Sequence, residues 1–286
     1  MKMDKIKEEN HWAVEAEQIS YTYEGNEKKA LDGVSLKLKK GRKIAFMGGN
    51  GSGKSTLFLC MNGILKPQEG KVRINGSPME YTRKSLLEVR RKVGIVFQEP
   101  DDQLFSASVF QEISFGILNL GVDEESARKE VERVIEKLGI TPFRDRPAHA
   151  LSGGQKKLVS IADILVMHPE VLILDEPAAS LDPKHRKLVR SIIGQLSESG
   201  LTILMATHDV DYAYAWADEI VLLHEGKVLR HGTPRQVCGD EEAMEQANLE
   251  APAVMRLYWQ LLRRGVIGPG EEQPKTIEDL ERRISG

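Results

Sequence analysis

Residues 48–56 read Gly48-Gly49-Asn50-Gly51-Ser52-Gly53-Lys54-Ser55-Thr56. This stretch matches the pattern G-x-x-x-x-G-K-[ST], and the apolar segment Lys43 to Met47 before it supplies the strand that the pattern requires. Glycines allow consecutive backbone N–H groups to converge on phosphate oxygens, and the helix expected over Ser55 to Met61 adds a favourable dipole. The sequence therefore predicts a nucleotide-binding loop between a buried strand and a helix.

Two side chains of this loop carry specific expectations. Lys54 should reach the β- and γ-phosphates of the nucleotide, and the Ser55 hydroxyl should coordinate Mg²⁺. The other loop residues expected to contact the nucleotide are Gly48, Asn50, Gly51, Ser52, Gly53 and Thr56. Taken alone, the loop indicates a nucleotide site and no particular reaction.

An acidic pair follows the apolar run Val171 to Leu174. Asp175, at the end of the expected strand, would hold Mg²⁺ directly or through water. Glu176 beside it could polarise an attacking water as general base. The alternative is a pair of solvated acids at a strand end, and the phosphate-binding pattern upstream makes that interpretation the weaker one.

The pentapeptide Leu151-Ser152-Gly153-Gly154-Gln155 lies about 20 residues before Asp175. Ser152 and the two glycines are expected to open a helix that begins near Gln155 and Lys156. The free N–H groups of such a helix end form an anion site that needs no basic side chain. A serine cap followed by a glycine turn is the structural alternative, which the position before Asp175 disfavours.

These motifs, together with Gln98 and His208, stand in the order found in ATP-binding-cassette ATPases. The chain resembles that family from about Ala16 to about Val237. The resemblance implies that Gln98 contacts Mg²⁺ and the attacking water, and that His208 bonds the γ-phosphate and positions the same water. A histidine after a strand is more often structural, but His208 occupies the position at which the family places its switch histidine.

The resemblance also implies a head-to-tail dimer with two ATP molecules between the subunits. In the family fold the turn 152–155 closes over the ATP of a partner, and Asp182 of Ser180-Leu181-Asp182 is expected at the same interface. Tyr23 stands where the family stacks an aromatic ring on adenine, with Tyr21 as the competing candidate and core packing as the alternative for both. The partner could be a second copy or another cassette ATPase.

The segment after Gln98 narrows the resemblance. Residues 99–106 read Glu-Pro-Asp-Asp-Gln-Leu-Phe-Ser, which is similar to energy-coupling-factor transporter ATPases that import vitamins or nickel and cobalt. Residues 208–211 and 216–218 resemble the nickel and cobalt branch. Asp101 and Asp102 would lie beside the groove that receives helices of a transmembrane subunit, unless they form only an exposed acidic turn.

Several residues depart from the family pattern, among them Gly49 and the pair Ala178-Ala179. Leu158 and Asp163 stand on the helix after the turn 152–155, where a basic residue and a small residue are expected. Neither should contact phosphate. We therefore expect them to affect helix packing and subunit coupling rather than ATP binding.

Composition is consistent with this assignment. The 286 residues carry a net charge of -3 with two distant cysteines, so neither a nucleic-acid partner nor a disulfide framework is expected. The first ten residues lack the apolar core of a signal peptide, and no stretch reaches the roughly 18 apolar residues of a membrane span. We expect a peripheral subunit on the cytoplasmic face of a bacterial or archaeal membrane, bound to a transmembrane coupling subunit and a substrate-binding membrane subunit.

The expected fold is α/β, with a P-loop NTPase core whose mixed sheet is RecA-like. An antiparallel β subdomain, an inserted helical subdomain at about 100–165 and a small C-terminal module complete it. The expected division is an N-terminal tail at 1–15, the cassette at 16–237 and a helical module at 238–286. Alternatives for function are a vitamin importer, an importer of amino acids or lipids, and a non-transport cassette protein acting on DNA or ribosomes.

Overall fold

The computed structural model of the chain describes residues 11–268 and 273–284. Most of the tail expected at 1–15 therefore lies outside the described residues. The first strand, β1, spans Trp12–Tyr21 and so begins four residues before the Ala16 start that alternation predicts. Within the described ranges, no helix has both the length and the apolar character that a bilayer span requires.

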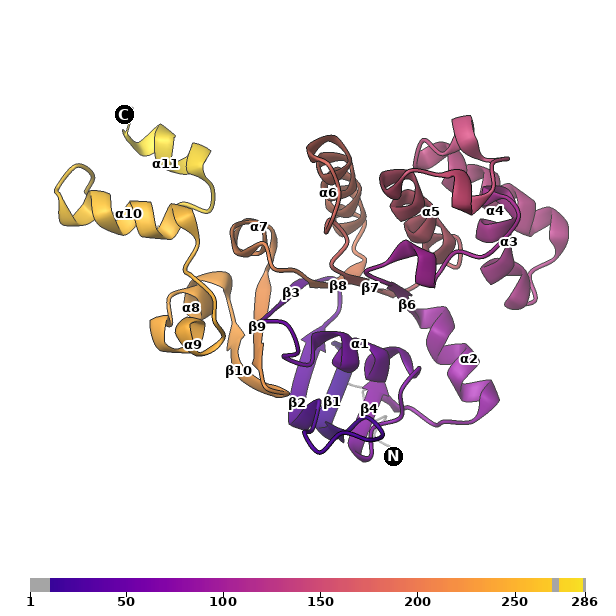
Figure 1. Ribbon diagram of the computed structural model, residues 1–286, viewed down its shortest axis with the longest axis horizontal. Coiled ribbons are helices and arrows are strands. Elements are labelled where there is room, and N and C mark those ends of the chain that lie inside the picture. The colour runs from indigo at the N-terminus through magenta and orange to yellow at the C-terminus, as the bar shows by residue number, and fades with distance from the viewer. Residues whose placement is uncertain (1–10, 269–272, 285–286) are drawn as a thin grey trace, which may run out of the picture.

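A six-stranded sheet forms the centre of the molecule (Figure 1). Its strands, in spatial order, are β10 (Lys227–Gly232), β9 (Glu219–His224), β3 (Lys43–Met47), β8 (Thr202–Ala206), β7 (Val171–Asp175) and β6 (Val93–Val96). All neighbours are parallel except β10, which is antiparallel to β9, so the predicted mixed sheet is confirmed. Strands β7 and β8 are buried at every residue because the sheet is covered on both faces.

Alternate residues of these strands serve different cores, as the two-residue period of a strand requires. Ile173 packs into a cluster shared with the antiparallel sheet, while Leu172 and Leu174 join a cluster formed by helices. The antiparallel sheet has the order β2 (Leu31–Lys39), β1, β4 (Glu69–Ile74) and β5 (Ser77–Pro78). Helix α1 (Lys54–Asn62) lies in that shared cluster, where Phe58 meets Phe46 edge to face with ring centroids 4.9 Å apart.

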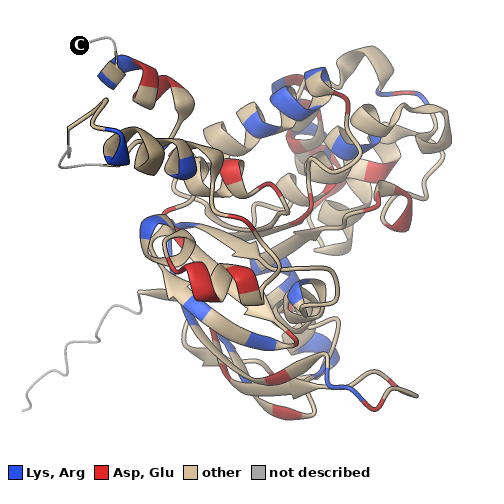
Figure 2. Ribbon diagram, turned by 60° about the vertical axis from the view of Figure 1, so that its left-hand side comes forward, with Lys and Arg blue, Asp and Glu red and all other residues tan. Residues whose placement is uncertain are grey.

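Helices cover the opposite face of the central sheet (Figure 1). They are α3 (Val109–Asn119), α4 (Glu124–Lys137), α5 (Gly153–Leu165) and α6 (Pro183–Glu198), and α7 (Val210–Trp216) lies beside them. The first three fall within the expected helical subdomain. Helix α2 (Arg83–Lys92) connects the antiparallel sheet to β6. Basic and acidic residues alternate along α4, so the charges on the helical side of the molecule are not gathered by sign (Figure 2).

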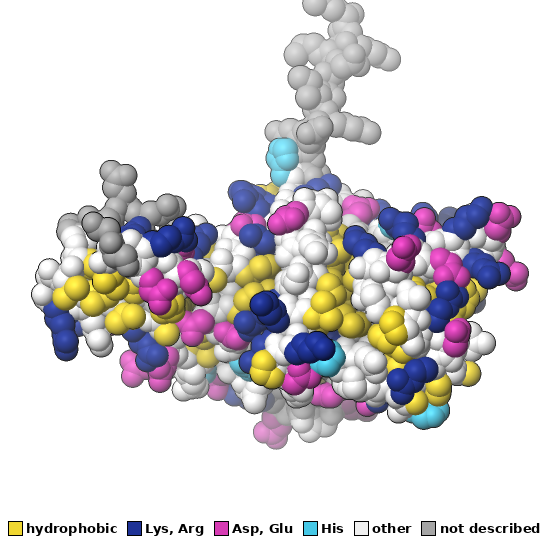
Figure 3. Space-filling model, turned by 90° about the horizontal axis from the view of Figure 1, so that it is seen from above, with side chains coloured by type: hydrophobic (Ala, Val, Ile, Leu, Met, Phe, Trp, Pro, Cys, Tyr) yellow, Lys and Arg dark blue, Asp and Glu magenta, His cyan; other side chains and the backbone are white. Residues whose placement is uncertain are grey.

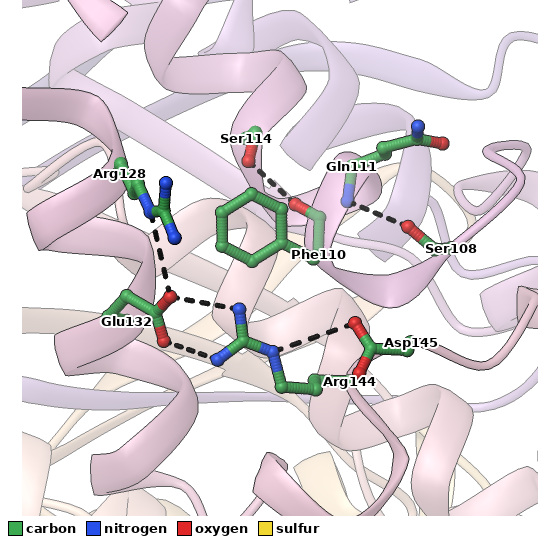
Figure 4. A network of polar contacts seen from close by, with 8 residues as sticks. All are labelled: Ser108, Phe110, Gln111, Ser114, Arg128, Glu132, Arg144 and Asp145. Atoms are coloured by element: carbon green, nitrogen blue, oxygen red, sulfur yellow. Dashed lines mark hydrogen bonds and ion pairs between the residues drawn. The ribbon is translucent and has the colours of Figure 1, made fainter. Parts of the chain in front are cut away.

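Arg144 fastens the connection that follows α4 (Figure 4). Its guanidinium donates to both carboxylate oxygens of Glu132, at 2.5 and 2.8 Å, and lies 5.0 Å from the ring centroid of Phe110. Bidentate pairs of this kind fix geometry as well as adding energy. Arg144 thereby holds α3 and α4 against the loop that leads to α5.

The C-terminal helices share a core with the central sheet. They are α8 (Pro234–Cys238), α9 (Glu241–Gln246), α10 (Ala253–Arg263) and α11 (Ile277–Ile284). Tyr258 of α10 belongs to the same apolar cluster as Met47 of β3 and Leu222 of β9. Seen from above, hydrophobic side chains also gather on the outer surface over these helices (Figure 3).

The two cysteines are free and fully buried. Cys60 lies in α1 and Cys238 ends α8. Burial raises the pKa of each thiol to about 12, because the thiolate is poorly solvated in an apolar core. Both side chains therefore serve as small core hydrophobes.

Candidate functional site

The loop between β3 and α1 can be built only with glycine at its two ends. Gly48 has φ +144°, and a Cβ there would lie 2.2 Å from the carbonyl oxygen of Leu223. Gly53 has φ +104°, and its Cβ would lie 2.6 Å from the carbonyl oxygen of Ala30. The loop passes so close to neighbouring backbone that it admits no side chain at either position. We call residues 48–53 the glycine cradle, and their binding of phosphate stays a prediction.

Lys54 is the first residue of α1, one position earlier than the expected helix start. Its buried ammonium donates to the carbonyl oxygens of Gly48 and Gly49, at 2.8 and 3.0 Å, and to Ser52 Oγ at 3.2 Å. Burial lowers its pKa, while the charges of Glu176 and Asp175 oppose that shift. No side chain caps α1, so the N–H groups of its first turn can bind an anion.

Asp175 and Glu176 lie at the carboxyl end of β7, and both are 7% exposed. Glu176 adopts φ +47°, a left-handed conformation that costs a residue with a Cβ on the order of 1–3 kcal/mol. Its Oε1 atom is buried and has no hydrogen-bond partner among the described residues. Its Oε2 atom accepts the backbone N–H of His208 at 3.3 Å. A strained backbone and a buried oxygen without a hydrogen bond are features that occur most often at functional sites.

His208 is brought directly to Glu176. Its Nε2 atom lies 3.1 Å from Glu176 Oε1, near enough for an ion pair but without the alignment of a hydrogen bond. Burial raises the pKa of Glu176, and the charge and backbone N–H of His208 only partly offset that effect. A cavity of about 370 Å³ borders both side chains, with Tyr212 on its wall. The two residues expected to act on the attacking water are therefore neighbours, and their roles stay predictions.

Gln98, which was also expected to act on the attacking water, makes no hydrogen bond to Glu176 or His208 within the described residues. Its side chain is exposed, and the described residues form no hydrogen bond or ion pair between it and Asp175, Glu176 or His208. Its carbonyl oxygen instead accepts Nζ of the buried Lys157 at 2.7 Å. Gln98 is thus fixed by its backbone, and its side chain lies free on the surface.

The turn 152–155 begins α5 at Gly153, so the expectation of a start near Gln155 is wrong by two residues. The reason is a capping box, in which Ser152 Oγ accepts the N–H of Gln155 and the Gln155 side chain accepts the N–H of Ser152. Gly154 is required because a Cβ there would lie 2.2 Å from the ring of His185. Ser152 and Gly153 remain exposed.

Tyr23 and Asp182, expected at the adenine and at the dimer interface, both contact other residues of the chain. The hydroxyl of Tyr23 lies 3.2 Å from Thr56 Oγ1, and its ring meets Tyr21 edge to face at 5.0 Å. Tyr23 is 38% exposed, which leaves its outer face available for stacking. Asp182 caps α6 by accepting two backbone N–H groups and pairs with the ring of His185. Its place at a dimer interface stays a prediction.

Two residues near this site have contacts that the sequence did not suggest. Lys157 is 1% exposed on α5, although it stands in a lysine pair that looks solvated. A signal was available, because position 157 falls on the buried stripe of Gly154, Leu158 and Ile161. The departure at Asp163 also has a partner, since its carboxylate accepts Gln103 Nε2 at 3.0 Å.

The residues present fit a nucleotide with Mg²⁺. The glycine cradle and the uncapped helix suit phosphate, and the unpaired Oε1 of Glu176 faces the same region as His208. In the described ranges no cluster of three or more His, Cys, Asp or Glu side chains could hold a metal alone.

Comparison with known proteins identifies the family. The family model for ABC transporters matches residues 31–179. The energy-coupling factor transporter ATP-binding protein EcfA of Methanocaldococcus jannaschii is 47% identical over 227 residues, which are 79% of this chain and 81% of that protein. A putative ABC transporter ATP-binding protein of Methanosarcina mazei is 43% identical over 267 residues, or 93% of this chain, and the matched region spans 58% of that longer relative.

Solved structures agree. Superposition on cbiO1 from Clostridium perfringens, part of the ABC transporter complex cbiONQ, gives a TM-score of 0.73 at 41% identity and covers 87% of this chain and 99% of that one. The cassette MJ0796, solved as a dimer after hydrolysis with ADP and Pi, gives 0.71 at 28% identity and covers 78% and 99%. With the cradle, the acidic strand end and the turn 152–155 arranged as described, the chain belongs to the ABC transporter ATPase family, among the homologues of energy-coupling-factor ATP-binding subunits.

Proposed function

We propose that this chain is the ATP-hydrolysing subunit of an energy-coupling-factor importer, bound at the cytoplasmic face of a bacterial or archaeal membrane. The observation that carries the hydrolytic role is Glu176 Oε1, a buried carboxylate oxygen without a hydrogen-bond partner that lies beside His208. A carboxylate in this setting has a raised pKa and can accept a proton from water. The similarity to EcfA supports the transport role.

In this mechanism each residue has a defined task. When ATP binds, the Lys54 ammonium donates to phosphate oxygens in place of the loop carbonyl oxygens that it contacts in this structure. The first-turn N–H groups of α1 orient the same phosphates. Ser55 and Asp175 would hold Mg²⁺, which supplies neutralisation of phosphate charge when bound. Glu176 accepts the proton of the attacking water, while His208 and Gln98 position that water.

The exposed turn 152–155 is proposed to act on ATP held by a partner cassette. The N–H groups of Ser152 and Gln155 are engaged in the capping box, so the glycine N–H groups of the exposed turn would be the ones offered to the partner's ATP. The dimeric state of the solved relative supports the same arrangement. Asp182 and Tyr23 would complete the sandwich, on the interface and on adenine respectively. The partner would be a second copy of the chain or a related cassette ATPase.

The surface around Phe105 is proposed as the contact with the transmembrane coupling subunit. Phe105 is 68% exposed and meets Phe115, itself 50% exposed, edge to face at 5.1 Å. Exposed apolar groups with polar neighbours are typical of protein contacts, and Asp101 and Asp102 provide the acidic border. The buried Glu112 shapes this loop by accepting the N–H groups of Phe105 and Ser106 at 2.9 and 2.5 Å.

Nickel or cobalt is the proposed cargo of the importer. The support is the resemblance of residues 208–211 and 216–218 to that branch, since the ATPase itself does not touch the transported ion. A vitamin importer of the same family is the second candidate, because segment 99–106 is similar in the vitamin importers and in the nickel and cobalt importers.

A pull-down tests the proposal. Tagged Glu176→Gln protein with ATP is captured from solubilised host membranes, and the bound proteins are identified by mass spectrometry. A metal-binding membrane subunit, together with nickel or cobalt uptake lost on deletion of the ATPase, supports the whole proposal. A vitamin-binding subunit overturns the cargo. A permease with an extracytoplasmic binding protein overturns the importer class.

A further inference from the structure

Lys157 is a fully buried lysine in a helix next to the site. Its Nζ atom donates to the carbonyl oxygens of Phe97 at 2.9 Å and Gln98 at 2.7 Å. Lysine is rarely buried to this extent without a partner of opposite charge at bonding distance, because removing an ammonium from water is costly. Burial lowers its pKa to about 8, with Glu99 and Asp175 as the carboxylates that oppose this shift.

The two carbonyls are informative because of where they lie. Strand β6 ends at Val96, so Phe97 and Gln98 have left the sheet and their oxygens need another donor. Lys157 supplies that donor from the first turns of α5, three residues after Gly154. A second tie joins the same two segments, since Gln103 Nε2 donates to the carbonyl oxygen of Ser160 at 2.9 Å.

We infer that Lys157 is a positioning residue that locks Gln98 to the start of α5, so that Gln98 and the turn 152–155 move as one body. The inference rests on the proposed role of Gln98. Because Gln98 would act on the chain's own ATP and the turn on the partner's, Lys157 couples the two nucleotide sites of the dimer. A neutral side chain at 157 releases Gln98 while the phosphate loop stays intact.

A double-mutant cycle in the full-length protein tests this inference. Lys157→Met should lower kcat for ATP about tenfold and leave KM within about twofold, because only positioning is lost. Lys157→Arg, which keeps the cation, should restore most of the rate. The double variant Lys157→Met/Gln98→Ala should be no slower than Gln98→Ala alone, since the lysine acts through that residue. Lys129→Met, on the exposed face of α4, is the matched control.

The outcomes distinguish an error in the proposed role of Gln98 from an error in the inference about Lys157. If Gln98→Ala keeps the wild-type kcat, the proposed role of Gln98 is wrong. If Gln98→Ala is slow but a folded Lys157→Met is as fast as wild type, or if their losses add, the positioning inference is wrong.

Amide hydrogen exchange of the wild-type protein decides the case in which Lys157→Met does not fold. The amides of residues 97–98 and of the turn 152–155 should change their exchange rates together when ATP is added, because the bonds from Lys157 join the two segments. Exchange rates that change in one segment and not in the other overturn the inference.

Discussion

At the scale of single residues, Glu176 combines three properties that rarely occur together. It has a left-handed backbone, a buried side chain and one carboxylate oxygen that makes no hydrogen bond within the described residues. Burial raises its pKa, so the proton that it would take from water is held more firmly than by an exposed glutamate. Since a general base must be deprotonated, kcat should rise with pH through this raised pKa.

The first prediction concerns the carboxylate itself. Glu176→Gln should reduce ATP hydrolysis by at least about 100-fold, because an amide cannot accept the proton. ATP binding should persist, since the cradle and Lys54 are unchanged. Phosphate release and equilibrium binding measure the two effects separately. A variant that hydrolyses ATP at near the wild-type rate would show that another group is the base.

The second prediction compares two adjacent glycines of the phosphate loop. Gly48→Ala should destabilise the loop by roughly 2 kcal/mol or more and abolish ATP binding, because its Cβ would lie 2.2 Å from the carbonyl oxygen of Leu223 at φ +144°. Gly49→Ala should change stability by less than about 1 kcal/mol, because its Cβ would meet only the carbonyl oxygen of Ala247 at 3.6 Å. Chemical denaturation and ATP titration of both variants provide the comparison. Equal effects would contradict it.

At the scale of elements, α5 is held to the segment 97–106 by polar side chains as well as by apolar packing. Asp163 of α5 accepts Gln103 Nε2. Burial and the nearby charge of Glu112 raise the pKa of Asp163 to about 7, while the bond from Gln103 opposes the shift. The unusual carboxyl on this helix is therefore costly to ionise and titrates near neutral pH.

The third prediction follows from that pKa. Between the unfolded value near 4 and the folded value near 7, the folded protein binds the extra proton, so stability falls as pH rises across this window. Asp163→Asn should be more stable than wild type by on the order of 1–3 kcal/mol above pH 7, and the gain should vanish below about pH 4. Urea melts at several pH values test this, with the exposed Asp145→Asn as control. A gain that does not depend on pH would contradict the assignment.

Some helices and strands could be predicted from their local sequence, and others could not. Strands β3 and β8 match their expected bounds, because each is a short apolar run buried on both faces. Helix α2 was not predicted, because its apolar face is short: only Val89 in it is buried, with the partly buried Leu86 packed against the same cluster. In the site, the phosphate loop and the acidic strand end follow from spacing. The bond from Lys157 to Gln98 joins residues 59 positions apart, which no local pattern encodes.

At the scale of the whole molecule, the C-terminal helices are built into the core rather than attached to it. Met255 and Tyr258 of α10 are 1% and 3% exposed, in the cluster that contains Met47 of β3. Residue 247, just after α9, reaches the phosphate loop at Gly49. The strand that carries the nucleotide loop is thus packed against residues from the end of the chain.

The fourth prediction tests that shared core. Tyr258→Ala should lower the free energy of unfolding by about 3 kcal/mol, because a large buried side chain leaves a cavity. Unfolding should remain a single transition if the helices and the sheet are one cooperative unit. Calorimetry with and without ATP provides the measurement. A separate low-temperature transition would show that the C-terminal helices melt alone.

Because the thiols of Cys60 and Cys238 are buried, the rate of their chemical modification measures how often the chain opens locally. A disulfide reagent attacks thiolate, and at pH 8 a thiol with a pKa of about 12 is ionised in only about one molecule in ten thousand. Modification must therefore wait for the chain to open locally, so its rate counts opening events. Bound ATP should slow the modification of Cys60, behind the phosphate loop, while Tyr258→Ala should hasten that of Cys238. One reaction trace, resolved by peptide mass, would then time the local opening of two different core clusters.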